Sequence, residues 1–190
     1  GGVALTNDYD LAEKMVLLRS HGITRDPEKM THEPDGEWYY QQVELGYNYR
    51  MTDIQAALGL SQMARLDEFV ERRHDIANRY DGLLHELPVR SQHRPMTSYS
   101  CMHLYIIRLI PNKLEKTHKQ IFFELREAGI GVNLHYIPVH TQPYYENMGF
   151  KKGDYPEAEK FYGEAISLPI FPELSLDEQN KVVKALEAIL

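Results

Sequence analysis

The sequence predicts a mixed α/β protein in which one long helix leads into a small carboxy-terminal α/β domain. Strand-like and helix-like segments alternate over residues 90–190, the order expected of an α/β or α+β domain. Before them, apolar residues recur at near-helical spacing from Ile54 to Leu87, a longer run than a small domain needs. The 190 residues, 43% of them hydrophobic, are enough for one or two domains with a sizeable core.

The beginning of the chain contains a strand, a helix and a long connection. We expect a strand near Val3 to Thr6 and a helix over about residues 9–20 that Gly22 can close. Residues 23–51 carry little periodic pattern, and a connection of that length is either functional or disordered. Disordered segments are poor in aromatic residues, whereas this one contains Trp38, Tyr39, Tyr40, Tyr47 and Tyr49. We therefore interpret Gly46 to Ala57 as an active-site loop that runs into a capped helix.

The helix after this loop has a defined start. Thr52 and Gln55 have the spacing of a capping box, in which each side chain binds the backbone N–H of the other residue. Apolar side chains then form one stripe until Pro88, which ends the helix. We expect a single helix over residues 52–87, roughly 50 Å long at about 1.5 Å per residue, that bridges two bodies of structure.

The carboxy-terminal part alternates between strands and helices. Residues 90–100 are polar and rich in helix-breaking residues, which indicates a seam before a separate small domain. Gly129 is placed to end a helix and Pro138 to end a strand, and Ser175 with Glu178 forms another capping box. Strands are expected over residues 103–110, 131–137 and 166–170, and helices over 113–128, 156–164 and 176–190.

Charge and cysteine content exclude some classes of protein. The net charge is −7 and the cations are not clustered, which argues against a duplex nucleic-acid partner. No apolar run approaches the length that crosses a bilayer, so no membrane partner is expected. Cys101 is the only cysteine, so no intrachain disulfide can form and a reducing compartment, the cytoplasm, fits best. An anionic ligand would need a local cation, for which Arg50 is a candidate.

Nine histidines raise the question of a metal site. His135 and His140 lie close in sequence, but no H-E-x-x-H motif or cysteine pair accompanies them, so we expect no metal. Gly129-Ile130-Gly131 resembles the start of a dinucleotide fingerprint. It follows a helix and precedes a strand, the reverse of the order that phosphate binding requires, and we discard it.

Polar and aromatic side chains crowd the end of the strand expected over residues 131–137, a place where ligand groups often collect. Alternation puts His135 and Tyr136 on opposite faces, so they share a pocket only if the strand bends before Pro138. A structural role is an equal alternative for each of them. Likewise, Asn48 and Arg50 could simply satisfy loop carbonyls and a helix carboxylate.

Several motifs occur together and in a characteristic order. They are Gly1–Asp8, Arg19–Gly22, Gly46–Leu66, His103–Tyr105, Gly129–His140 and Ser167–Pro169. In this combination, over essentially its whole length, the chain resembles sugar-nucleotide aminotransferases of the DegT/DnrJ/StrS group. The segment from Gly36 to Gly46 resembles the branch that aminates a UDP-4-keto-6-deoxy-N-acetylhexosamine, as in the biosynthesis of pseudaminic acid for cell-surface polysaccharides.

The resemblance implies the fold of type I enzymes that depend on pyridoxal 5′-phosphate (PLP), of which this chain would be the carboxy-terminal part. Residues 1–51 would be the tail of the large PLP-binding domain and its active-site loop, 52–88 the bridging helix, and 89–190 the small α/β domain. In this family the Schiff-base lysine precedes a Gly-Gly pair like the one that begins this sequence. We therefore expect no catalytic lysine in this chain and no transaminase activity of residues 1–190 alone.

The resemblance also implies the reaction and the site residues. An amino acid, expected to be L-glutamate, donates an amino group to the cofactor, which passes it to the keto carbon of the nucleotide sugar. Asn48 reaches the cofactor phosphate of the neighbouring subunit in a homodimer with shared active sites. Arg50, His135 and Tyr136 are expected to contact the substrate.

Two alternatives stay open at the level of sequence. Some relatives replace the lysine with histidine and dehydrate keto sugars, so the parent could be a lysine-free dehydratase. The chain could also be a binding or dimerisation module without chemistry, since its apolar stripe and exposed aromatic residues suit such a role.

Overall fold

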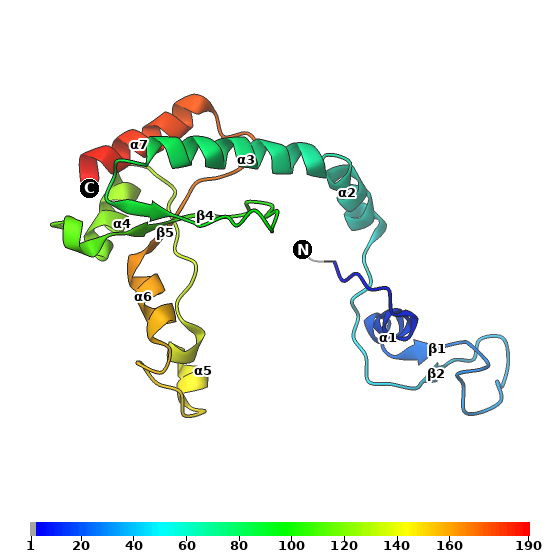
Figure 1. Cartoon of the computed structure of the whole chain (residues 1–190). Helices are drawn as coiled ribbons and strands as arrows, with labels where there is room; N and C mark the ends of the chain where they lie inside the picture. Colours follow the sequence, from blue (N-terminus) through cyan, green and yellow to red (C-terminus); the bar gives the residue numbers. More distant parts are fainter. Residues whose placement is uncertain (1–2) are drawn as a thin grey trace. The chain divides into compact units, whose positions relative to one another are not determined.

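The computed structural model describes residues 3–190, which fall into two compact units divided between Met63 and Ala64 (Figure 1). The Gly1-Gly2 pair of the opening motif lies outside the described residues. No helix among residues 3–190 is long and apolar enough to cross a membrane.

The first unit is built from short elements. Helix α1 spans Tyr9–Arg19, strands β1 (Ile23–Thr24) and β2 (Gln41–Gln42) pair antiparallel, and helix α2 spans Asp53–Met63. The expected strand near Val3 to Thr6 is wrong, because these residues have no regular structure. The side chains of Thr6 and Asp8 instead accept hydrogen bonds from the nearby backbone N–H groups of Asp8 and Leu11, which builds a helix cap.

The single helix expected over residues 52–87 is wrong, because two helices occupy this range. The capping box of Thr52 and Gln55 is present and starts α2. Helix α3 spans Leu66–Leu83, and Arg65 before it has φ −111° and ψ 7°. The apolar spacing explains the break: at about 100° per residue, Met63 lies roughly 180° around the helix from Ile54, so the two halves do not share one stripe.

The second unit contains a three-stranded antiparallel sheet in the order β3-β4-β5. Strand β3 is Val89–Ser91, β4 is Tyr105–Leu109 and β5 is Ala165–Leu168. The polar segment 90–100, which was expected to separate the helix from the small domain, therefore begins inside strand β3. The strand expected over 131–137 is wrong, because only Asn133 pairs there, through an isolated bridge to Ser167.

Most helix ends in this unit follow local signals. Helix α4 begins with a capping box of Thr117 and Gln120, and α7 with the expected one of Ser175 and Glu178. Gly129, at φ 78°, follows the end of α4 as expected. The helical segments of this unit after α3 are η1 (Pro111–Lys113), α4 (His118–Glu127), η2 (Val139–Thr141), α5 (Pro143–Glu146), α6 (Pro156–Glu164) and α7 (Leu176–Ile189).

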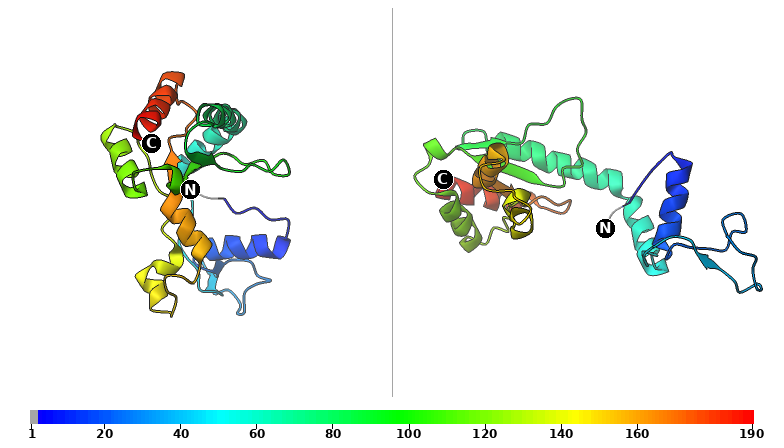
Figure 2. Two further views of the ribbon diagram at one scale, coloured as in Figure 1. Left: turned by 60° about the vertical axis from the view of Figure 1, so that its left-hand side comes forward. Right: turned by 90° about the horizontal axis from the view of Figure 1, so that it is seen from below.

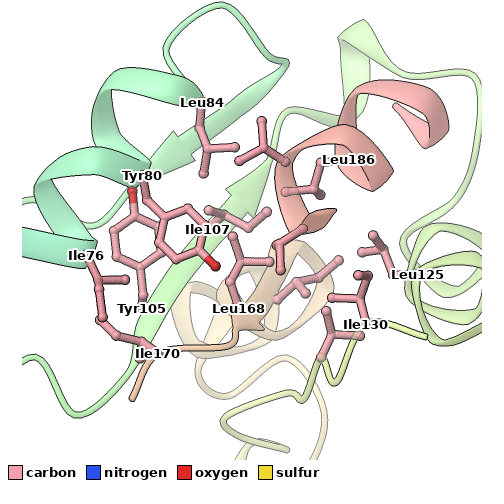
Figure 3. Packing of buried hydrophobic residues seen from close by; sticks show 14 of the residues in the cluster. Ile76, Tyr80, Leu84, Tyr105, Ile107, Leu125, Ile130, Leu168, Ile170 and Leu186 are labelled. Carbon is pink, nitrogen blue, oxygen red and sulfur yellow. The ribbon is translucent and has the colours of Figure 1, made fainter. Parts of the chain in front are cut away.

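The hydrophobic core lies entirely in the second unit of the described chain (Figure 3). Helix α7 contacts both α3 and α4, which lie beside it (Figure 2). Strand β4 alternates buried and half-buried residues, and Tyr105 packs on Tyr80 of α3 with ring centroids 4.9 Å apart. The other face of β4 meets α6, where Arg108 binds Glu164 at 2.7 Å. This core supports the segment that carries the candidate site residues His135 and Tyr136.

Candidate functional site

The loop at residues 46–50 is attached to the end of α1. The carbonyls of Leu18 and Arg19 accept hydrogen bonds from the backbone N–H groups of Tyr47 and Tyr49, at 2.7 and 2.8 Å. The last carbonyls of a helix lack partners within the helix, so the loop satisfies them. The rings of Tyr47 and Tyr49 stack with centroids 5.0 Å apart. The loop is therefore held against the end of α1 by backbone hydrogen bonds.

Two glycines allow this close approach. A Cβ atom on Gly46 would lie 2.2 Å from the backbone nitrogen of Gly22. Gly22 has φ 69°, and a Cβ atom on it would lie 2.0 Å from the carbonyl oxygen of Glu44. Only glycine fits at both positions, which fixes the path of the loop next to α1.

The loop presents two polar side chains, Asn48 and Arg50, and both are exposed. The Nε–H of Arg50 donates to Oδ1 of Asn48 at 3.3 Å. Among residues 3–190, neither the Asn48 amide nitrogen nor the terminal guanidinium nitrogens of Arg50 has a hydrogen-bond partner, and Arg50 has no carboxylate partner. The pair thus offers several free N–H donors and one positive charge, a combination that suits the oxygens of an anion such as a phosphate.

A second cluster gathers around His135 and Tyr136 in the other unit. Nδ1 of His135 lies 2.9 Å from the hydroxyl oxygen of Ser167, and its ring meets that of Tyr136 edge-on at 5.7 Å. Both residues line one open hollow of about 550 Å³, a size typical of small-molecule sites. They share it because residues 134–137 do not form the expected strand. Other side chains on the hollow are His118, Lys119, Phe122 and Tyr162.

His140, four residues after Tyr136, contributes to structure and not to this hollow. It is buried, and its Nε2 lies 2.9 Å from Oε1 of Glu159. Gly153 donates its N–H to the same carboxylate oxygen at 2.6 Å. The bond from His140 is the main cause that lowers the pKa of Glu159, followed by the bond from Gly153. This carboxylate therefore ties η2 and the loop before α6 to α6 itself. No group of three His, Cys, Asp or Glu side chains placed to hold a metal occurs within residues 3–190.

The structure brings the four predicted residues together as two pairs, one in each unit. Asn48 contacts Arg50, and His135 contacts Tyr136. Sequence reasoning missed Ser167 as a partner of His135. The available signal was a serine within the apolar run of residues 165–170, because a buried hydroxyl needs a hydrogen-bond partner.

Comparison with known proteins defines the class to which these features belong. Residues 1–187 match the model of the DegT/DnrJ/EryC1/StrS aminotransferase family. The chain therefore belongs to this family, and the resemblance inferred from its motifs is confirmed.

Three individual members of the family show what this chain is similar to. The chain is 34% identical to the UDP-4-amino-4,6-dideoxy-N-acetyl-β-L-altrosamine transaminase of Campylobacter jejuni over 192 residues, which are 100% of this chain and 48% of that protein. The structure matches PseC of Helicobacter pylori, an aminotransferase involved in the biosynthesis of pseudaminic acid, with a TM-score of 0.84 and 29% identity over 97% of this chain and 47% of that one. It also matches DesV of S. venezuelae, solved in complex with a ketimine intermediate, with a TM-score of 0.82 and 28% identity over 97% and 45% of the two chains.

These matches confirm the expected fold class, the carboxy-terminal part of a PLP-dependent transferase of fold type I. The chain spans about half the length of the curated relatives that it matches.

Proposed function

We propose that the whole protein to which this chain belongs is a PLP-dependent aminotransferase that moves an amino group from L-glutamate to a 4-keto-6-deoxy nucleotide sugar. The observation that carries this proposal is the match of residues 1–187 to the aminotransferase family. The donor pair on the loop and the aromatic hollow in the second unit are consistent with binding an anionic cofactor group and a sugar.

The residues of the loop fit the cofactor. When bound, PLP supplies an electron sink for the bond changes at the amino-bearing carbon. The amide N–H groups of Asn48, which have no partner in the described chain, would donate to its phosphate oxygens. Arg50, which has no carboxylate partner within the described chain, offers its positive charge to an anionic group of the substrate.

In the proposed homodimer, the candidate site residues serve active sites that the two subunits share. Asn48 completes the phosphate site of the neighbouring subunit, so each active site contains residues of both chains. Arg50, His135 and Tyr136 bind the nucleotide sugar. Residues 1–51 belong to the large domain with its active-site loop, residues 52–88 connect the domains through α2 and α3, and residues 89–190 form the small domain. The catalytic lysine lies in the other part of the protein, so residues 1–190 alone are inactive.

The finer assignment follows the activity named for the Campylobacter jejuni relative. We propose a UDP-linked 4-keto-6-deoxy-N-acetylhexosamine as the amino acceptor and the biosynthesis of pseudaminic acid for cell-surface polysaccharides as the process. A cytoplasmic location suits both the nucleotide sugar and the single cysteine.

The test is to incubate the whole protein with PLP, L-glutamate and the UDP-linked keto sugar and to identify the products by mass spectrometry. The proposal expects a 4-amino sugar and 2-oxoglutarate, and no turnover by residues 1–190 alone. A dehydrated sugar formed without consumption of glutamate would identify a lysine-free dehydratase instead. Unchanged substrates would favour a binding or dimerisation module.

A further inference from the structure

Ser167 is a buried polar residue within the apolar strand β5. Its side chain is 4% exposed, and its neighbours in the strand are the buried Ile166 and Leu168. Its backbone N–H donates to the carbonyl of Asn133 at 2.8 Å and its carbonyl accepts from Asn133 at 3.2 Å. In the described chain, its hydroxyl has one hydrogen-bond partner, Nδ1 of His135 at 2.9 Å. Three hydrogen bonds therefore hold the segment that carries His135 against β5.

The tautomer of His135 can be argued from the hydroxyl hydrogen of Ser167. A neutral imidazole has one nitrogen that donates and one that accepts. If Nδ1 carried the hydrogen, the buried O–H of Ser167 would have no acceptor among the described residues, which is costly. If Nδ1 accepts, the hydroxyl is satisfied and the ring hydrogen lies on Nε2.

We infer that Ser167 is a positioning residue, whose hydroxyl donates to Nδ1 of His135 and thereby presents the Nε2–H of that ring as a donor to the ligand in the hollow. Nε2 has no hydrogen-bond partner within the described chain, and His135 lines the hollow beside Tyr136. A fixed donor selects an acceptor, so the matching ligand group is an oxygen of the sugar nucleotide. The identity of this ligand rests on the proposed function, whereas the tautomer does not.

The tautomer can be measured on protein labelled with ¹⁵N at histidine, by two-bond ¹H–¹⁵N correlation spectra of the His135 ring. We expect the hydrogen on Nε2 in the wild type. In Ser167→Ala, the ratio of the Nε2–H to the Nδ1–H form should fall about three- to tenfold, the effect of losing one ordinary hydrogen bond. Ser167→Thr keeps the hydroxyl and should restore the wild-type ratio.

Two controls separate this effect from a change in fold. Ser98→Ala removes an exposed serine hydroxyl far along the chain and should leave the His135 signals unchanged. The ring signals of His140, which is bound to Glu159, report whether the fold of the second unit is kept. A wild-type ring with its hydrogen on Nδ1, or an unchanged ratio in a folded Ser167→Ala variant, would overturn the inference. If Ser167→Ala loses the His140 signals, the variant has not kept its fold. The wild-type spectrum then tests the inference by itself, because it shows which nitrogen of His135 carries the hydrogen.

The role toward the ligand is tested in the whole protein by the steady-state constants for the keto sugar. We expect Ser167→Ala to raise KM more than it lowers kcat, and Ser167→Thr to recover KM. A changed tautomer with an unchanged KM would overturn the claim that the Nε2–H of His135 binds the ligand. The claim that Ser167 fixes the tautomer of the ring would stand. An absence of amino transfer in the wild type would overturn the proposed function and leave the tautomer result standing.

Discussion

At the scale of single residues, Gly22 and Gly46 set the position of the loop that carries the candidate cofactor site. Neither has a side chain, and their backbones approach so closely that a Cβ atom on either would overlap its neighbours. This contact sets where the loop leaves α1, and therefore where Asn48 and Arg50 lie. The sequence motif marked both glycines, but only the structure shows that they contact each other.

Replacement of Gly46 by alanine should destabilise the protein and loosen the loop. The added Cβ atom meets backbone atoms at 2.2 and 2.5 Å, which cannot move as the end of a side chain can. We expect a loss of about 2–3 kcal/mol in the free energy of unfolding of the segment, measured by native-state hydrogen exchange at Tyr47 and Tyr49. Gly82→Ala is the matched control, since a Cβ atom at that exposed position in α3 would meet nothing within 4 Å. Unchanged exchange in Gly46→Ala would contradict the proposed packing.

The carboxylate of Glu159 should make the stability of the second unit dependent on pH. Its pKa is lowered below the ordinary 4.5, chiefly by the hydrogen bond from His140. Folding therefore gains stability above this ordinary value and loses it as the pH falls through the lowered value. Denaturant unfolding should show wild type more stable than Glu159→Gln at about pH 6, with the difference shrinking toward about pH 3. The exposed Glu157 of the same helix provides the control Glu157→Gln, for which we expect no such pH dependence.

At the scale of elements, local signals were enough for most helix ends. The capping boxes at Thr52 and Ser175 and the positive φ of Gly129 were predictable, because each depends on residues within one turn. The break before α3 was harder to predict, because a nearly helical apolar spacing hides a stripe that drifts around the helix. The missing strand at residues 131–137 depends on partners distant in sequence, which no local pattern reveals.

The start of α4 provides a test of these local signals. The side chain of Thr117 accepts from the backbone N–H of Gln120 at 3.3 Å, and Gln120 returns the bond to Thr117 at 2.8 Å. This box was present in the sequence, although the helix was expected to begin near residue 113. Thr117→Ala should lower the free energy of unfolding by about 1 kcal/mol in denaturant titrations. Thr97→Ala, at an exposed turn, should change it little, and equal effects of both changes would argue against the cap.

At the scale of the whole molecule, the two units differ in how they are stabilised. The hydrophobic core belongs to residues 64–190, whereas no residue of α2 is buried within the described chain. The exposed apolar side chains of α2 are Ile54, Leu58, Leu60 and Met63. The proposed homodimer and the other half of the protein would cover such a surface. The four candidate site residues were selected from family motifs, whereas the contact of Ser167 with His135 spans 32 residues and no local pattern indicates it.

The most direct test of the shared active site mixes two inactive variants of the whole protein. One replaces the Schiff-base lysine, and the other is Asn48→Asp, which puts a carboxylate beside the cofactor phosphate and should release PLP by charge repulsion. If Asn48 serves the neighbouring subunit, each mixed dimer has one intact site. Unfolding and refolding the two variants together should then restore about a quarter of the wild-type transaminase activity, since half of randomly formed dimers are mixed. If activity stays absent although mixed dimers form, Asn48 does not complete the partner's site and the account is contradicted.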